Sequence, residues 1–139
     1  MPAIEIIFII LGALSAANGA WMLVSAPTWY ENLPGVVDTG AYNGHFVRDI
    51  GLAYFVSGAG FVWCAFNLRR CWPAVVAQAL WATGHALLHV ADMVTVRMPL
   101  THWIIDAPSV LLPGAVLGVL AVPRVWRIVN PLAREAPSA

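Results

Sequence analysis

Four long apolar stretches dominate this sequence, at residues 3–25, 44–66, 73–95 and 103–122. A helix of roughly 20 apolar residues is enough to cross the hydrocarbon core of a bilayer. The composition agrees, because 60% of the 139 residues are hydrophobic and only 10% are charged, whereas soluble domains average about 25% charged residues. Pro113 predicts a kink or local unwinding in the fourth stretch. We therefore predict an all-α integral membrane protein, with residues 1–139 forming a single four-helix transmembrane bundle.

The arginines indicate how these spans are oriented. All seven basic residues are arginine, and five of them lie at one end of the spans: Arg69, Arg70, Arg124, Arg127 and Arg134. Such an excess marks the cytoplasmic side of a membrane. We expect both termini in the cytoplasm and the loops at 26–43 and 96–102 on the outer side, which is the periplasm if the protein lies in a bacterial inner membrane. The net charge of zero argues against a nucleic-acid partner.

Side chains that bind metals or protons gather in the outer halves of three of the predicted spans. Ionisable residues within membrane segments are costly and usually functional. The set includes all four histidines and three of the four aspartates of the chain. We take it as the candidate metal site, and its members are His45, Asp49, His85, His89, Asp92, His102 and Asp106.

The third span carries the clearest spacing signal within this set. His85, His89 and Asp92 follow an i, i+4, i+7 pattern, which places them on one face of a helix. Two histidines one turn apart can hold one metal ion. If the second and third spans share a site, Asp49 should lie within reach of His89 or Asp92.

Three further polar residues are expected to support the site as hydrogen-bonding neighbours. Asn18 lies in the outer half of the first span, Arg48 precedes Asp49, and Gln78 lies one heptad before His85. Small residues recur on the first two spans as well, at Gly12, Ala16 and Ala20 and at Gly51 and Gly58. Stripes of this kind allow membrane helices to approach closely.

Some of the candidate ligands also have a structural interpretation. Asp106 precedes an Ala-Pro pair, which is typical of a helix N-cap followed by a first-turn proline. His102 is alternatively a solvated loop histidine, and Asp49 a partner for Arg48 or Arg97 across the bundle. A subunit whose polar layer is only an ion-pair and hydrogen-bond network is therefore an alternative.

The ligand types leave the metal undecided between copper, zinc and iron. Imidazole suits all three, and carboxylate adds a harder ligand. Met22, Met93 and Met98 lie near the outer ends of their spans and would favour Cu(I), although methionine is also an ordinary apolar filler. The set is large enough for two ions, and a b-type haem held by two histidines is the alternative cofactor.

These observations favour metal-dependent redox or hydroxylation chemistry on a lipophilic small molecule taken from the bilayer. The combination of histidine and carboxylate is similar to that of membrane-bound metal oxygenases as a class, although no family motif is present. We expect the chain to act alone, as a homo-oligomer or as a subunit of a larger membrane complex. A haem or metal-handling subunit is the alternative, and the sequence leaves open whether the chain is itself an enzyme.

Overall fold

The computed structural model of the protein describes residues 3–133, which form helices joined by short turns with no strand among them. Three of the helices are long: α1 (Ala3–Val24), α3 (Gly44–Phe66) and α4 (Trp72–Val94). Each is long and apolar enough to cross a membrane. Their bounds lie within one residue of the first three predicted spans, which confirms a helical chain with the character of a membrane protein.

The fourth apolar stretch is divided into several pieces, so the predicted span at 103–122 needs correction. These pieces are α5 (His102–Ile105), the π-helical turn η2 (Ala107–Leu111), α6 (Leu112–Leu120) and α7 (Pro123–Val129). The local unwinding predicted at Pro113 lies slightly earlier, in the π-helical turn that contains Pro108, and Pro113 itself is in the first turn of α6. The segment formed by η2 and α6 meets α7 at an angle of 92°. Residues 3–133 therefore contain three candidate spans, or four if this bent pair counts as one.

The segment at 26–43, predicted as a loop, contains two short helical elements. They are α2 (Ala26–Asn32) and the 3-10 turn η1 (Val36–Thr39). The indole Nε1 of Trp29 donates to Asn18 Oδ1 at 2.9 Å, which ties α2 to α1. The segment is thus folded back against the long helices, and its side chains occupy defined positions.

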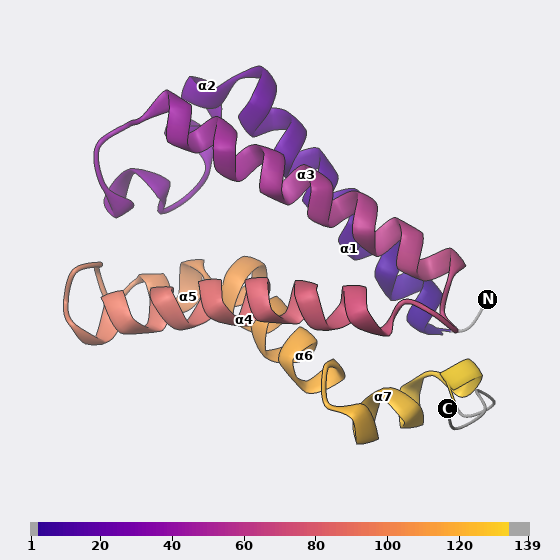
Figure 1. Ribbon diagram of the computed structural model, residues 1–139. Coiled ribbons are helices and arrows are strands. Elements are labelled where there is room, and N and C mark those ends of the chain that lie inside the picture. Colours follow the sequence, from indigo (N-terminus) through magenta and orange to yellow (C-terminus); the bar gives the residue numbers. More distant parts are fainter. Residues whose placement is uncertain (1–2, 134–139) are drawn as a thin grey trace.

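Glycines let α1 and α3 pack along each other as a pair (Figure 1). A Cβ atom added to Gly19 would lie 2.5 Å from the carbonyl oxygen of Gly51, and one added to Gly58 would lie 2.6 Å from the backbone nitrogen of Ala16. No side chain fits at these distances, so the helix backbones are almost in contact. Gly12, Ala16, Gly51 and Gly58 of the predicted stripes therefore lie at this interface, together with Gly19, which was not predicted.

A second pair is formed by α4 and α6. The hydroxyl of Thr83 donates to the carbonyl oxygen of Gly114 at 2.8 Å, and a Cβ on Gly114 would lie 2.6 Å from that of Ala86. Figure 1 shows the two pairs lying close together where α3 turns into α4 and diverging towards the opposite end. The predicted four-helix bundle and the orientation of its termini stay predictions, because the fourth candidate span is bent by 92°.

The main buried core lies at the end where the pairs meet. It joins α1, α3, α4, α6 and α7 and includes Phe8, Phe61, Val75, Leu117 and Trp126. The ring centroids of Phe8 in α1 and Trp126 in α7 are 6.2 Å apart. The start of α1 and the helix α7 therefore lie at the same end of the molecule. Arg134, used above for the orientation, lies outside the described residues.

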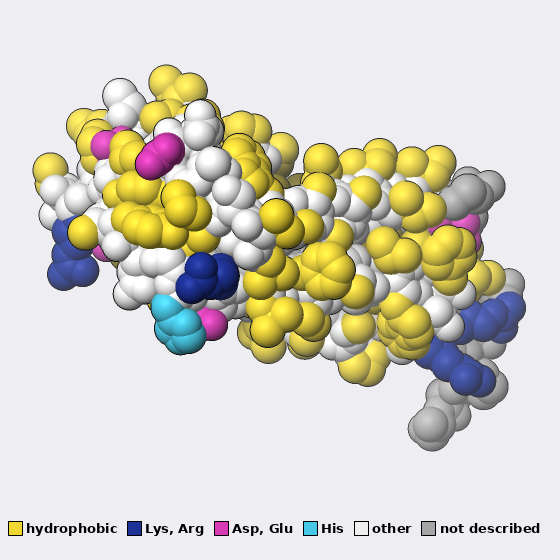
Figure 2. Space-filling model, turned by 90° about the horizontal axis from the view of Figure 1, so that it is seen from above, with side chains coloured by type: hydrophobic (Ala, Val, Ile, Leu, Met, Phe, Trp, Pro, Cys, Tyr) yellow, Lys and Arg dark blue, Asp and Glu magenta, His cyan; other side chains and the backbone are white. Residues whose placement is uncertain are grey.

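Large apolar side chains cover much of the outer surface. Leu14, Val56, Phe66, Leu80 and Leu88 are each at least 60% exposed. Figure 2 shows hydrophobic side chains along one face of the molecule, with charged side chains gathered towards its two ends. A continuous apolar surface of this extent marks contact with a membrane or another protein, in agreement with helices that cross a bilayer.

Candidate metal centre

Three of the seven predicted ligands come together in one buried group. His89 extends from α4, His102 lies in α5, and Asp106 stands between α5 and η2. One ligand atom from each lies within 4.8 Å of the others. Oδ2 of Asp106 is 2.7 Å from Nδ1 of His89 and 2.9 Å from Nδ1 of His102. This group has the donor types and the spacing that could hold a metal ion.

The local backbone explains how His102 and Asp106 face each other. They are four residues apart in one helical turn, in which Asp106 N donates to His102 O at 2.9 Å. The carbonyl oxygen of Asp106 then accepts from both Val110 N and Leu111 N, which widens the next turn into a π-helix. Turns of this kind occur frequently at functional sites.

This geometry excludes the simpler interpretations of the two residues. The carboxylate of Asp106 accepts no capping hydrogen bond from the following turn and contacts the two histidines instead. His102 is not a solvated loop residue, because it is completely buried.

Asp38 is a fourth member of the group, and sequence reasoning missed it. Its Oδ2 atom is 3.2 Å from Nε2 of His102. The turn that carries it begins after Gly35, whose φ of 84° is left-handed. A Cβ on Gly35 would lie 2.7 Å from Cε1 of His102, so the loop packs directly against the imidazole. The one available signal was that Asp38 is the single aspartate outside the predicted set.

His102 therefore lies between two carboxylates, one at each ring nitrogen. Ionised carboxylates only accept hydrogen bonds, so both nitrogens of His102 carry protons when both aspartates are charged. His102 precedes the fourth candidate span, which begins at Ala107. Burial alone would lower the pKa of His102, but the hydrogen bonds and charges of Asp106 and Asp38 outweigh it and raise the pKa above its usual value.

His85 lies beside the group and extends it towards α3. Its ring centroid is 4.7 Å from that of His89, and it stacks on Trp81 at 5.8 Å with an interplanar angle of 7°. The hydroxyl of Tyr54 is 3.4 Å from Nε2 of His85. A row of polar and aromatic side chains thus runs from the candidate metal centre to the middle of α3.

The other predicted ligands make contacts of their own. His45 and Asp49 pair with each other at 3.3 Å on the exposed surface of α3, where their side chains are 84% and 61% exposed. Asp92 pairs with Arg97 at 3.6 Å. Asp49 therefore does not form the ion pair with Arg48 or Arg97 that was its alternative interpretation, and α3 contributes no ligand to the buried group.

The three predicted supporting residues also lie elsewhere. Asn18 bonds to Trp29 and, through Nδ2, to the sulfur of Met22 at 3.7 Å. Arg48 is exposed on α3. Gln78 lines a groove between α3 and α4, on the same side of α4 as Trp81.

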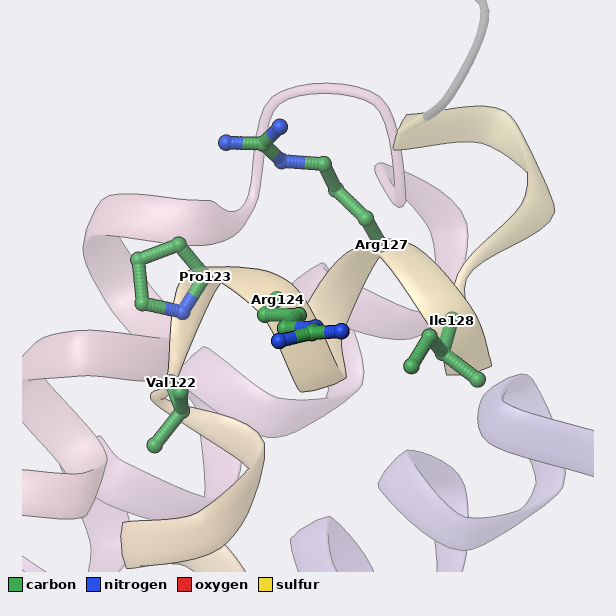
Figure 3. Close-up of a pocket in the computed structure, with 5 residues that line it drawn as sticks. All are labelled: Val122, Pro123, Arg124, Arg127 and Ile128. Carbon is green, nitrogen blue, oxygen red and sulfur yellow. The ribbon is translucent and has the colours of Figure 1, made fainter.

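A hollow of about 620 Å³ lies on α7, away from these residues. It is lined by Val122, Pro123, Arg124, Arg127 and Ile128. Figure 3 shows the Arg127 side chain extending away from Val122 and Ile128. Long basic side chains on an apolar helix end place their charges in the membrane interface. This hollow contains no histidine or carboxylate, so it is not the candidate metal centre.

No family model matches the chain, and no curated protein and no solved structure is significantly similar to it. Its function must therefore be inferred from the chemistry of the buried group itself.

Proposed function

We propose that this protein binds one divalent transition-metal ion through His89, His102 and Asp106 and uses it in redox or hydroxylation chemistry on a lipophilic substrate. One observation carries the proposal. Two imidazole nitrogens from separate helices converge on the same carboxylate oxygen, at 2.7 and 2.9 Å, within a largely buried part of the molecule. Small shifts of these side chains would place three ligand atoms around one ion.

The charge of the group favours a cation. With His89 counted as neutral and His102 as protonated, the two carboxylates of Asp38 and Asp106 leave the metal-free group with a net charge of −1. A divalent ion that displaces the Nδ1 proton of His102 would bring this net charge to zero. Uncompensated charge is expensive in a poorly solvated site, so the bound ion would remove this cost.

Asp38 has a defined part in this arrangement. When Nδ1 of His102 binds the metal, Nε2 must carry the remaining proton, and that proton is donated to Asp38. A carboxylate behind a metal-binding histidine holds the ring in its orientation and makes it a stronger ligand. The loop carboxylate would therefore set both the tautomer and the direction of His102.

The donor set favours iron or zinc among the metals considered. Two histidines and one carboxylate with open coordination positions are typical of non-haem Fe(II) oxygenases, and catalytic zinc also uses three protein ligands. Cu(I) receives no support from Met22, whose sulfur accepts a hydrogen bond from Asn18 on α1. Haem is disfavoured because the two histidines share one carboxylate oxygen, which leaves no space for a macrocycle between them.

The open positions of such an ion would be available to a substrate or to oxygen. When bound, iron supplies one-electron chemistry, and either metal supplies Lewis-acid polarisation. We place the protein in a bacterial inner membrane with this centre near the periplasmic face, acting alone or within a larger complex. The apolar surfaces of its long helices would bring the centre into contact with molecules dissolved in the bilayer.

A structural network is the second candidate, and one observation favours it. The contacts of His102 and Asp106 are satisfied without a metal, since each ring nitrogen of His102 already faces a carboxylate. In that case the group would join α4, α5 and the loop at 26–43 as a buried ion-pair network. Such networks fix conformation without performing chemistry.

Metal analysis of the purified protein separates the two candidates. The detergent-purified chain should contain, or take up on incubation with Fe(II) or Zn(II), about one ion per chain. His89→Ala and His102→Ala should lose it, because each removes one of three ligands. His45→Ala is the matched control and should keep the ion, since His45 is exposed and pairs only with Asp49. Absence of metal uptake in the native chain, or full metal content in both ligand variants, would establish the structural network instead.

A further inference from the structure

An open groove of about 460 Å³ lies between α3 and α4. Ligand sites in proteins typically enclose about 300–1,000 Å³. Apolar side chains form most of its walls, with Leu52, Ala53 and Val56 on α3 and Ala77 on α4. Both helices are long and apolar enough to cross a membrane. The groove therefore opens towards lipid, and its occupant must come from the bilayer.

Asp49, which pairs with His45, lines the outer end of the groove. Two uncharged polar side chains lie deeper among the apolar walls, Ser57 on α3 and Gln78 on α4. No residue of the described chain forms a hydrogen bond with the amide of Gln78 or the hydroxyl of Ser57. A polar group facing hydrocarbon without a partner costs free energy. A bound molecule with a hydroxyl or carbonyl oxygen would satisfy both groups, because an amide N–H and a hydroxyl can each donate to it.

Aromatic side chains connect the groove to the candidate metal centre. Trp81 lines the groove and stacks on His85, whose ring lies 4.7 Å from that of His89. The helices are antiparallel, and the contact between Tyr54 and His85 shows which of their residues lie at the same depth. From the level of this contact, Asp49 on α3 and His89 on α4 each lie about one helical turn closer to the outer end. Because Asp49 and Gln78 both line the groove, the groove extends from the level of Gln78 to the level of the metal centre.

We propose that this groove binds an uncharged, single-chain lipophile carrying a hydroxyl or carbonyl oxygen. Its oxygen bonds to Gln78 and Ser57, and its chain lies along the apolar wall of α3 towards His85 and His89. Eleven residues separate Gln78 from His89 on α4, which corresponds to about 16 Å along a helix, so an extended molecule is required. The role of this molecule as the substrate rests on the proposed metal chemistry, whereas its binding does not.

Photolabelling tests the site directly. The protein in phosphatidylcholine vesicles is irradiated with a fatty alcohol that carries a diazirine on its chain, and the labelled residues are mapped by mass spectrometry. Labels should concentrate on residues 52–57 and 77–81. An excess of unlabelled fatty alcohol should compete for these positions, whereas an alkane of equal length should not.

Three variants sharpen the test. Ala77→Trp places an indole in the groove and should abolish the concentrated labelling. Ala59→Trp is the matched control and should label as the native chain does, because Ala59 is exposed on α3 outside the groove. Gln78→Leu removes a hydrogen bond to the oxygen and should weaken competition by the alcohol roughly fivefold to tenfold.

Metal content, measured on the same samples, separates this proposal from the preceding one. Ala77→Trp should keep its metal and lose the label, and His89→Ala should lose its metal and keep the label; each result supports the groove. Localised labelling of a chain that never binds metal would also support the groove, while rejecting the metal chemistry. Labels spread evenly over the exposed apolar surface, or unchanged by Ala77→Trp, would overturn the proposal.

Discussion

The carboxylate of Asp38 and the imidazole of His102 lie 3.2 Å apart, although 64 residues separate them in the chain. The Asp38 side chain is 42% exposed, whereas that of His102 is 1% exposed. A side chain of a surface loop thus contacts the most buried polar residue of the candidate metal centre. Two of the four predictions that follow test this contact.

The first prediction is that Asp38→Asn weakens metal binding while leaving all three ligands in place. Asparagine cannot stabilise the Nε2–H of His102 as a carboxylate does, and loss of such a supporting group typically costs about 10–100-fold in metal affinity. Competition titration with a chromophoric zinc chelator measures the change. Asp92→Asn is the control, because Asp92 pairs with Arg97 outside the group. Equal affinities for the two variants would show that Asp38 has no such role.

The second prediction concerns the glycine that brings the loop onto His102. Gly35→Ala should destabilise the protein, since a left-handed conformation costs a non-glycine residue about 1–2 kcal/mol, and the added methyl would also press on the imidazole. Thermal unfolding measures the effect. Gly84→Ala should instead be neutral or stabilising, because a Cβ there meets nothing within 4 Å and alanine favours helix by up to about 1 kcal/mol. A melting temperature unchanged by Gly35→Ala would contradict the observed loop conformation.

The third prediction is that pH acts in opposite directions with and without metal. In chelator-treated protein, the raised pKa of His102 means that its ion pairs stabilise the fold fully below about pH 6.5, the unfolded value. This contribution is lost as the pH rises through the folded pKa. In metal-loaded protein, the imidazole nitrogens that bind the ion must be deprotonated. Protons compete with the metal for these nitrogens, so the stabilisation by metal is lost as the pH falls. Melting temperatures measured across this range should show both trends, and neither should persist in His102→Ala.

The fourth prediction tests the orientation that the arginines suggest. Val37→Cys on η1 should react with a membrane-impermeant maleimide added to intact cells, and Ile128→Cys on α7 should react only after the cells are opened. Both side chains are more than half exposed. The native Cys64 and Cys71 are completely buried and should contribute little background. The reverse pattern would place the candidate metal centre on the cytoplasmic side.

The helices themselves were largely predictable from the sequence. The bounds of α1, α3 and α4 follow from the length of apolar segments, because a helix must satisfy its own backbone hydrogen bonds wherever it contacts lipid. The fourth segment was less predictable, since Pro108, Pro113 and Pro123 interrupt its hydrogen bonding. Prolines show where a break is possible, but the angle of 92° depends on how α7 packs against the rest of the chain.

The sequence by itself determined which side chains were candidates for the metal centre, because ionisable residues in apolar segments are conspicuous. Only the tertiary structure decided which of them meet. The rotation of α3 about its own axis is set by the close approach of Gly51 and Gly58 to α1, and this rotation leaves His45 and Asp49 on the surface. Asp38 reaches His102 because the loop folds back through the left-handed turn at Gly35. Helical periodicity relates residues within one helix, whereas contacts between segments depend on packing that involves the whole chain.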